Sequence, residues 1–470
     1  MYLEHKHHAL KLNRDTLFGF LFLIALGLIP INTFAQDVQP DRDPPVYGIG
    51  ENATFTVSGA SGALYDLYYD TDVDAQDIQT NQSVSGSTIT IPAPGQPGLI
   101  IGDLNQGGFP NKDFAAVFDP FAISPYAQEP FSPTFDAFWN GVFATIPSNS
   151  YPQINTLQSV STSVPNVDAY SFDFDGIPAF DGSGTPLRLQ GYVMVPTNAS
   201  GPLPAIIKLP AFNSGRDDLF NQYWNDIATY TPAILILPDV QPIGESAGYA
   251  AGTDDFTDRE KYHYKFSVAA IRQILDFLDV QSNYNGKVGL WGESQGGGLS
   301  LMVAGLDSRV DAVCVSKPAL CEHGAILNGK ASGFNDYVRI GSTGPNNLNP
   351  QIFEAAKYYD AVYAASRINI PTFVEMGYLD IVAPSATAWA AINQLKGNIS
   401  IAHLFKRDHA GAEDIGFLSE TGKMFFREHL QNNIQDIPDE NYYYANVGAT
   451  EVNAQVGVAK NFSGEIYRNG

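Results

Sequence analysis

Basic residues are scarce in this chain of 470 residues: Lys and Arg number 26, Asp and Glu number 50, and the formal net charge is −24. Such an acidic chain repels the phosphates of nucleic acid, which argues against a nucleic-acid partner. The same repulsion disfavours an anionic membrane surface or an anionic polysaccharide as a ligand. A neutral substrate is compatible with the charge, which also gives the protein a solvated, soluble surface.

Cysteine is almost absent, since the chain has only Cys314 and Cys321. Two cysteines are too few for a disulfide scaffold. They could pair with each other in an exported protein. However, Cys314 lies in the apolar run DAVCVS, which is typical of a buried strand, so we expect two separate buried thiols.

Long apolar runs are also missing, except for LFGFLFLIALGL at residues 17–28, which is too short for a comfortable membrane span. Three basic residues precede this run, and Thr33 and Ala35 supply the small residues of a cleavage site. The pattern predicts a secretory signal peptide over residues 1–35, cut after Ala35. The mature protein would then be secreted or periplasmic, with no membrane attachment. The alternative is an uncleaved membrane anchor.

Residues 36–118 have the pattern of short strands. The runs TFTVSG, ALYDLYYD, STITIPA and GLIIGDL alternate or are apolar, and Gly, Ser, Asn and Asp clusters separate them. We therefore predict a small all-β sandwich domain of immunoglobulin type. A structural or substrate-presenting role is the default for it. Carbohydrate binding through Tyr65, Tyr68 and Tyr69 is the alternative, although Tyr is also a common strand residue.

The pattern changes near Pro120. PAIIKLPAF and TPAILILPD are continuous apolar runs, typical of parallel strands buried on both faces. Amphipathic stretches alternate with them, among them PQIFEAAKYYDAVYAASRI, which we interpret as one helix. This alternation predicts a doubly wound α/β domain over residues 119–431. Residues 432–470 are polar and Asn-rich and form an extension without a structural assignment.

A strand-like run, KVGLW, leads directly into GESQGGG and then into a helical pattern. A strand, G-x-S-x-G and a helix form the nucleophile elbow of α/β-hydrolases, so we predict that fold with Ser294 as the nucleophile. Gly292 and Gly296 would leave room for close packing of the strand on the helix. The backbone N–H of Gln295 would point at the developing oxyanion, assisted by the helix N-terminus.

The partners of such a serine follow it in the order acid, then histidine. His409 lies in KRDHAGA, a loop after the apolar strand SIAHLF, at the strand end where such sites form. The other histidines beyond residue 35 fit less well. His263 precedes the serine, His323 follows the next strand too early, His403 lies inside a strand, and His429 ends the last helix, where we expect it on the surface.

Asp380 closes the strand pattern PTFVEMGYLD and is the predicted acid. Asp408 is adjacent to His409 and poorly placed to reach the far ring nitrogen, and Asp360 lies inside a helical pattern. The loop after PAIIKLPAF should supply the second oxyanion donor, which we assign to the N–H of Phe212.

From about Pro120 to His429 the chain resembles the acetyl xylan esterase and cephalosporin C deacetylase family, the seventh family of carbohydrate esterases. The resemblance rests on FDAFW, GYVMVP, YHYKFS, GESQGGG, PALCEHG and the long run KYYDAVYAASRINIPTFVEMGYLDIVAPSATAWAAINQL. It implies removal of acetyl groups from xylan fragments and other small acetylated sugars, with no metal or cofactor. It also implies a homo-oligomer, and a Ser, Asp and His matching Ser294, Asp380 and His409. Secreted relatives with an extra N-terminal β domain are similar to this chain.

Three positions depart from the family pattern. The His-Gly-Tyr loop is Pro210-Ala211-Phe212 here, the Arg-Gly-Gln motif is Gln241-Pro242-Ile243, and Ala410 replaces the Glu after the histidine. The catalytic serine is also preceded by Glu293, where the family has a small residue; we expect this side chain to face solvent. These changes bear on the choice of substrate.

Three functions are therefore compared. The first is a secreted esterase acting on acetylated xylo-oligosaccharides or related sugars through an acetyl-enzyme. The second is a hydrolase of another ester, a peptide or a bulkier acyl group. The third is a glycan-binding homologue without catalysis, which the altered loops favour and the complete set of Ser, Asp and His disfavours.

Overall fold

The structure is a computed structural model of the chain. It describes residues 37–42, 45–58, 63–69, 77–104, 114–126, 132–148, 150–220, 232–240, 255–328, 349–404, 407–409, 414–431, 455–461 and 464–467. The predicted signal peptide, the Gln241-Pro242-Ile243 loop and Ala410 lie outside these residues. In the described part of the chain, no helix is both long and apolar enough to cross a membrane.

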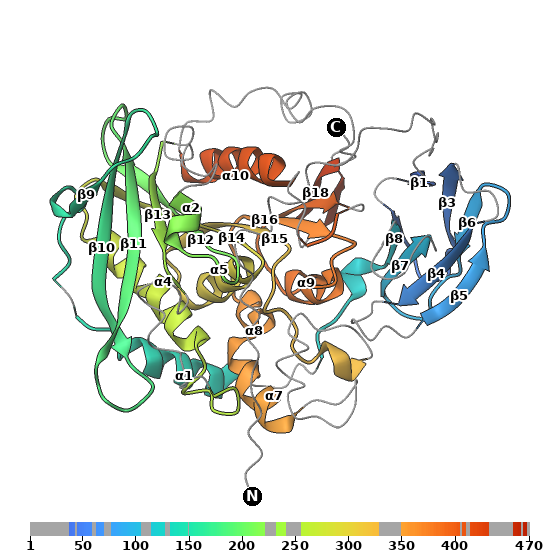
Figure 1. The fold of residues 1–470 in the computed structure, drawn as a ribbon, viewed down its shortest axis with the longest axis horizontal. Coiled ribbons are helices and arrows are strands. Elements are labelled where there is room, and N and C mark those ends of the chain that lie inside the picture. The colour runs from blue at the N-terminus through green and yellow to red at the C-terminus, as the bar shows by residue number, and fades with distance from the viewer. Residues whose placement is uncertain are drawn as a thin grey trace, which may run out of the picture.

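An 11-stranded sheet forms the centre of the molecule, in the order β19-β18-β17-β16-β15-β14-β12-β13-β11-β10-β9 (Figure 1). The six strands from β17 to β13 are parallel, and the strands at both ends are antiparallel. The parallel strands are β12 (Leu203–Leu209), β13 (Ile234–Pro238), β14 (Tyr284–Glu293), β15 (Val310–Ser316), β16 (Thr372–Gly377) and β17 (Ile399–Leu404). The antiparallel strands are β9 (Gln158–Val160), β10 (Val167–Pro178), β11 (Pro186–Pro196), β18 (Gln455–Asn461) and β19 (Gly464–Tyr467).

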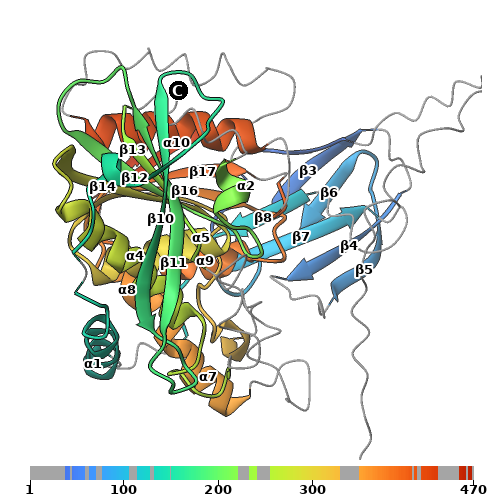
Figure 2. The ribbon, with the colours of Figure 1, turned by 60° about the vertical axis from the view of Figure 1, so that its left-hand side comes forward.

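Helices cover both faces of this sheet, with α10 on one face and α4, α5, α8 and α9 on the other (Figures 1 and 2). Side chains alternate along β14 to suit the two layers: Leu290 joins the core under α4 and α5, and Trp291 joins the core under α10 with Phe426. Burial of each such side chain contributes about 1.5–3 kcal/mol. The helices are α1 (Ser132–Phe143), α2 (Arg216–Phe220), α4 (Tyr264–Asp279), α5 (Gln295–Leu306), α7 (Pro350–Ala356), α8 (Ala361–Ala365), α9 (Ser385–Ile392) and α10 (Asp414–Leu430).

The N-terminal part of the chain is all β, as expected, and forms two small sheets in the orders β1-β3-β6 and β2-β8-β7-β4-β5. Together with the mostly parallel central sheet and its helices, this region confirms the predicted fold class. The strands are β1 (Asp37–Pro40), β2 (Val46–Tyr47), β3 (Ala53–Ser58), β4 (Leu64–Tyr69), β5 (Asp77–Ser83), β6 (Thr88–Ile91), β7 (Gly98–Leu104) and β8 (Phe114–Phe118).

This β region packs against α9. Leu99 and Val117 share a core with Trp389, and the ring of Phe121 meets Trp389 edge-on at 5.1 Å. The Asn393 side-chain amide donates to the carbonyls of Pro120 and Ile123, at 2.8 and 2.9 Å. The N-terminal region is therefore joined to the helix that follows the predicted acid, Asp380.

The tyrosines considered as a carbohydrate platform do not form one face. Tyr65 is buried in the core between the two small sheets. Tyr68 is only partly buried, and the side chain of Tyr69 lies outside what the structure describes. Burial of Tyr65 makes it a packing residue, because a sugar cannot reach it.

The helix predicted over residues 350–368 is broken. The structure has α7, a short 3-10 helix η7 (Lys357–Tyr359) and then α8, with Asp360 between the last two. The Asp360 carboxylate caps α8 by accepting from the N–H of Val362 at 3.0 Å, and it also accepts from the N–H groups of Glu322 and His323 at 2.8 Å. By accepting these hydrogen bonds, Asp360 begins a new helix and binds the segment after β15, so one continuous helix does not form.

The C-terminal extension, which had no assignment from sequence, contributes β18 and β19 to the central sheet. β18 pairs antiparallel with β17, and β19 pairs antiparallel with β18. These strands cover the edge that β17 would otherwise leave unpaired. Both cysteines are buried and not bonded to each other, as expected.

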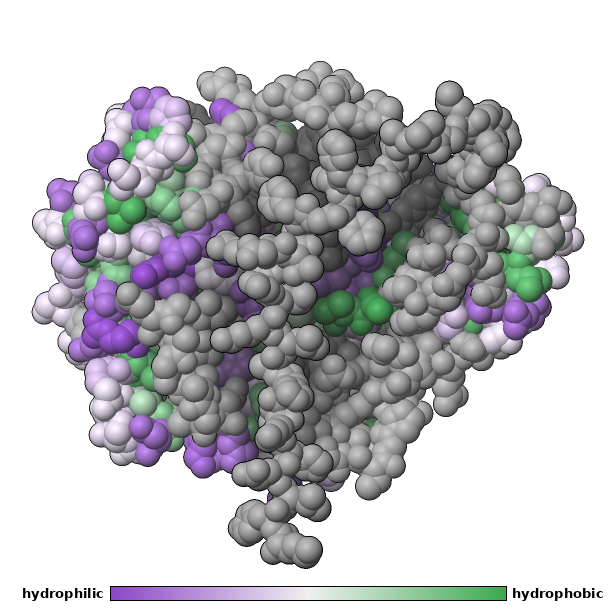
Figure 3. All heavy atoms as spheres, in the orientation of Figure 1, coloured by the Kyte–Doolittle hydropathy of each residue, from purple (hydrophilic) through white to green (hydrophobic). Residues whose placement is uncertain are grey.

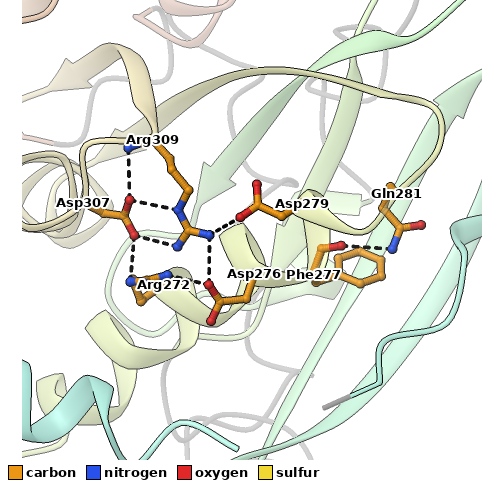
Figure 4. Close-up of polar contacts among 7 residues, drawn as sticks. All are labelled: Arg272, Asp276, Phe277, Asp279, Gln281, Asp307 and Arg309. Atoms are coloured by element: carbon orange, nitrogen blue, oxygen red, sulfur yellow. Dashed lines mark hydrogen bonds and ion pairs between the residues drawn. The ribbon is translucent and has the colours of Figure 1, made fainter. Parts of the chain in front are cut away.

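Charged residues hold the C-terminal ends of α4 and α5 together in a network of two arginines and three aspartates (Figure 4). Asp307, at the end of α5, binds Arg272 of α4 at 2.8 Å and Arg309 at 2.7 Å. Arg309 also binds Asp276 and Asp279 at 2.9 and 2.5 Å. We call these five residues the arginine–aspartate network. Figure 3 shows hydrophilic residues, with apolar ones scattered among them, on the left-hand part of the face that it draws.

Candidate active site

Ser294 occupies a sharp turn between β14 and α5. Its backbone has φ 54° and ψ −119°, a conformation that non-glycine residues rarely adopt. The turn is held on both sides: the Ser294 N–H donates to the Ser316 carbonyl at 3.0 Å, and its carbonyl accepts from Ala319 at 2.9 Å. Strain of this kind persists only where the surrounding structure enforces it, and it lifts the hydroxyl out of the sheet.

Glycines around Ser294 make this turn sterically feasible. A Cβ on Gly292 would lie 2.1 Å from the backbone of Gly296, and one on Gly296 would lie 2.6 Å from the Leu209 carbonyl oxygen. A Cβ on Gly298 would lie 2.1 Å from the Ala319 carbonyl oxygen. Because backbone atoms block all three positions, α5 approaches β14, the end of β12 and the segment after β15 more closely than any side chain would allow.

His409 lies between Ser294 and Asp380. Its Nε2 is 2.9 Å from the Ser294 Oγ, and its Nδ1 is 2.7 Å from the Asp380 Oδ2. The three residues come from the ends of β14, β16 and β17, at the carboxyl edge of the parallel strands. The three predicted residues therefore meet in one hydrogen-bonded chain.

Asp380 is fixed independently of the histidine. Its Oδ1 accepts from the N–H groups of Val382 and Ala383, both at 2.8 Å, and the residue is buried. One carboxylate oxygen is thus occupied by backbone, which leaves Oδ2 aimed at His409. This arrangement selects the ring tautomer that carries a proton on Nδ1 and leaves Nε2 free to accept one.

One backbone donor for an oxyanion, the Gln295 N–H, is adjacent to Ser294. Gln295 is the first residue of α5, so its N–H has no acceptor within the helix. Its buried side chain is held by the Tyr264 hydroxyl, which donates to the Gln295 Oε1 at 3.1 Å. Phe212 lies in the turn after β12, its ring is 44% exposed, and this turn begins beside Gly296.

The remaining histidines occupy other environments. His403 is buried in β17, as expected, and accompanies Tyr378, whose hydroxyl contacts its Nδ1. Burial lowers the pKa of His403 to about 4. His323 is also buried, which lowers its pKa. His429, expected on the surface, is half-buried and packs edge-on against Phe425 at 4.6 Å.

Sequence reasoning missed a group of charged residues below Ser294. Lys208, Lys317 and Glu375 are buried, and Glu293, expected to face solvent, has a side chain only 29% exposed. The available signal was a single charge inside or directly after an apolar strand, as in PAIIKLP, CVSKP and TFVEMG. Among the described residues, no group of three His, Cys, Asp or Glu side chains is arranged to hold a metal ion.

The mostly parallel sheet, its two helical layers and the strand–turn–helix at Ser294 give the chain the α/β-hydrolase fold. Residues 240–430 match the sequence model of the acetyl xylan esterase (AXE1) family. The acetyl esterase Axe7A of Xylanibacter ruminicola is 28% identical over 312 residues, which span 63% of this chain and 67% of that protein. The resemblance to the acetyl xylan esterases is thus confirmed, and it supports a carboxylic ester hydrolase.

Two solved structures share the fold. The acetyl xylan esterase from Paenibacillus sp. R4 superimposes with a TM-score of 0.52 at 23% identity, over 66% of this chain and 98% of that one. Acetyl xylan esterase 1 from Thermoanaerobacterium sp. has a TM-score of 0.54 at 21% identity, over 66% of this chain and 97% of that one. At these identities the likeness establishes the fold alone.

Proposed function

We propose that the protein is a secreted serine esterase that removes acetyl groups from acetylated xylo-oligosaccharides or related small acetylated sugars through an acetyl-enzyme. The observation that carries the proposal is the position of His409, within hydrogen-bonding distance of both the Ser294 Oγ and the Asp380 Oδ2. A serine, an imidazole and a carboxylate in this order form the arrangement that activates a hydroxyl for attack on an ester.

In the first half of the reaction, the Ser294 Oγ attacks the acetyl carbonyl carbon while His409 Nε2 takes the hydroxyl proton. Asp380 stabilises the resulting imidazolium through the Nδ1 hydrogen bond and is not itself protonated. The tetrahedral intermediate then collapses, the bond to the sugar oxygen breaks, and His409 returns the proton to that oxygen. The sugar leaves and acetyl-Ser294 remains.

Water completes the cycle by the same steps. His409 takes a proton from water, the hydroxide oxygen attacks the acetyl carbon, and the Ser294 oxygen leaves with the proton that His409 returns. In both halves the negative charge develops on the former carbonyl oxygen. The N–H groups of Gln295 and Phe212 are the proposed donors to it, and the N-terminus of α5 adds its partial positive charge.

The choice of acetylated sugars rests on relatives and on charge. The matched family and relatives are named for acetyl ester and acetyl xylan hydrolysis. The acidic chain, with a net charge of −24, is suited to a neutral substrate. Export follows from the predicted cleavage after Ala35, which is tested by the mass of the mature protein isolated from its native compartment.

The test is acetate release from acetylated xylo-oligosaccharides by the wild type and by Ser294→Ala. We expect release from the wild type and a loss of about 10³-fold or more in the variant. Aryl acetate, propionate and butyrate esters, measured in parallel, separate an acetyl esterase from a hydrolase of larger acyl groups, because a small acyl pocket gives a steep fall with chain length. Failure of a serine-directed phosphonate to label Ser294 would identify a catalytically inactive glycan-binding protein and contradict the proposal.

A further inference from the structure

Four charged residues lie at or near the carboxyl ends of neighbouring strands of the central sheet, close to Ser294. They are Lys208 of β12, Glu293 of β14, Lys317 directly after β15, and Glu375 of β16. We call them the lysine–glutamate cluster. Glu293 pairs in register with Ser316, and Ser316 pairs with Glu375, so the two glutamates project from the same face of the sheet. Lys208 pairs with the residue two positions before Glu293, which places it on that face as well.

The cluster is balanced, with two ammonium groups and two carboxylates in a buried setting. Lys317 Nζ lies 3.9 Å from the Glu293 Oε1, and the Lys317 side chain is only 1% exposed. Burial lowers the pKa of Lys208 to about 8, against the opposing effect of Glu293, Cys314 and Glu375. Buried charges of this kind need compensating partners, so removal of one charge is expected to disturb the others.

The Lys317 side chain and the segment that carries His409 both lie against Gly377. A Cβ on Gly377 would lie 3.0 Å from the Lys317 Cδ, 3.1 Å from the Arg407 carbonyl oxygen and 3.2 Å from the Asp408 carbonyl oxygen. The lysine stem and the two carbonyls therefore share the space that Gly377 leaves open. The Leu379 N–H donates to the Arg407 carbonyl at 2.9 Å and ties the same segment to the strand end that leads to Asp380.

The backbone of Lys317 is held in an unusual conformation that directs its side chain into this space. Its φ is 43°, in the left-handed region, and its N–H donates to the Glu375 carbonyl at 2.9 Å. The left-handed region is costly for a lysine and is kept only when contacts elsewhere require it. Here the ion pair with Glu293 and the backbone hydrogen bond to Glu375 are contacts that favour it.

We propose that Lys317 is a positioning residue, which compensates the Glu293 carboxylate next to the nucleophile and supports the His409 segment from below, so that the imidazole stays between Ser294 and Asp380. This inference rests on the proposed esterase function. Lys317 is proposed to act through Glu293 and the segment 407–409, not as a catalytic residue. The sequence alone does not indicate such a role, because Lys317 is there a single charged residue after an apolar strand.

The proposal makes a prediction for the pH dependence, because a carboxylate without its ammonium partner favours a protonated imidazole nearby. The charged and titratable groups on the elements around Lys317 include Lys208 on β12, Glu293 on β14, Cys314 on β15, Glu375 on β16, Arg407 and Asp408 in the loop, and the buried Lys423 on α10. Of these, Glu293 is the partner at 3.9 Å and directly precedes Ser294. Lys317→Met removes the charge and keeps the length of the side chain.

The experiment measures kcat, KM and the pH profile of 4-nitrophenyl acetate hydrolysis for the full chain. We expect Lys317→Met to lower kcat about 10–100-fold with KM within about twofold, the size of effect that a misplaced catalytic group produces. The acidic limb of kcat/KM should move to higher pH by about half a unit or more. Glu293→Gln should move it to lower pH, and the double variant Glu293→Gln with Lys317→Met should return it to the wild-type position.

Lys357→Met is the matched control, because Lys357 pairs with Glu354 on α7, where Glu354 is largely exposed. It should leave both kcat and the pH profile unchanged. If Lys317→Met fails to fold, as judged by circular dichroism and by the fraction of sites labelled by phosphonate, the shift in Glu293→Gln decides alone. An acidic limb that coincides with the wild type in Glu293→Gln, or in a folded Lys317→Met, overturns the proposal.

The two proposals fail in different ways. Full activity in Ser294→Ala overturns the esterase mechanism and the role of Lys317 together. Loss of activity in Ser294→Ala, combined with wild-type kinetics and pH dependence in folded Lys317→Met, overturns the role of Lys317 alone.

Discussion

The lysine–glutamate cluster and the arginine–aspartate network are both groups of opposite charges, but they differ in setting. In the arginine–aspartate network the pairs are close, down to 2.5 Å for Arg309 and Asp279, and most side chains are partly exposed. In the lysine–glutamate cluster the side chains of Lys208, Lys317 and Glu375 are buried, and the pair Lys317–Glu293 is looser, at 3.9 Å.

The difference in residue type matches the difference in setting. Arginine has a planar group of donors that can bind several carboxylates at once. This suits the partly exposed site where the ends of α4 and α5 are joined (Figure 4). A buried lysine is a compact charge that is costly to desolvate and that any change in its partners will disturb. The first arrangement serves stability, and the second lies under the residues that carry out the proposed chemistry. The predictions below test this division.

The largest effect is expected from Asp380→Asn. The backbone N–H groups of Val382 and Ala383 can still be accepted by the amide oxygen, so the fold should be kept. The amide NH₂ would then face His409 and favour the wrong ring tautomer, which lowers kcat by about 10⁴-fold. Hydrolysis of 4-nitrophenyl acetate and a thermal melt measure the two quantities. A variant that keeps one-tenth of the wild-type rate would contradict the role of Asp380.

Burial of the neutral His403 imidazole in β17 should make the free energy of unfolding depend on pH. The folded pKa of His403 is about 4, below its ordinary value near 6.5. The unfolded chain therefore binds a proton first as the pH falls, so stability present above pH 6.5 is lost towards pH 4. The expected loss is about 3 kcal/mol.

Urea unfolding at pH 7 and pH 4.5 checks this prediction on the wild type and on His403→Gln. Only the difference between them is diagnostic, because Asp239 acts in the opposite sense. Burial raises the pKa of Asp239 to about 6, which makes stability fall as the pH rises from about 4 to 6. Equal pH slopes in the two proteins would refute the assignment to His403.

A smaller effect, on stability alone, is expected from Asp307→Asn. The Asp307 side chain is only 5% exposed and binds both Arg272 and Arg309. Burial raises the pKa of Asp307 and so offsets part of the benefit of its charge, but the change weakens several charge-assisted hydrogen bonds and should lower the free energy of unfolding by about 2 kcal/mol. The value of kcat should remain unchanged. If Asp307→Asn lowered kcat as much as Lys317→Met, the arginine–aspartate network could not be said to act on stability alone.

The smallest effect is expected from Asp279→Asn in the same network. The Asp279 side chain is 50% exposed. Burial, followed by the neighbouring carboxylates Asp276 and Asp307, raises its pKa, so its charge is partly opposed in the folded protein. The change in the free energy of unfolding should stay below about 0.5 kcal/mol. If Asp279→Asn lowered the free energy of unfolding as much as Asp307→Asn, the exposure of a side chain would not determine how much its ion pairs contribute to stability.

Local pattern was sufficient to predict much of this protein. Continuous apolar runs predicted the parallel strands, and the strand, G-x-S-x-G and helix predicted the turn at Ser294. Asp380 and His409 were predicted from their places at the ends of later strands, because parallel strands bring their carboxyl ends to one edge. The geometry brings these three residues within hydrogen-bonding distance.

Features that depend on distant partners were not predictable in this way. Periodicity predicted one helix through Asp360. In the structure the Asp360 carboxylate accepts hydrogen bonds from the N–H groups of Glu322 and His323, which are far from it in the sequence. The polar C-terminal extension had no assignment from the sequence, and its strand β18 pairs with the edge of β17. Lys317 has no signal that distinguishes it from a surface lysine, because its partners come from other strands.

The sequence by itself therefore determined the fold class, the order of the parallel strands along the chain and the identity of the three residues at their ends, since each depends on neighbours a few positions away. Only the tertiary structure decided the distances around His409, the broken helix at Asp360 and the burial of the lysine–glutamate cluster. The physical reason is that hydrogen bonds and charge compensation depend on separation in space, which residues far apart in the chain acquire only when the sheet has formed.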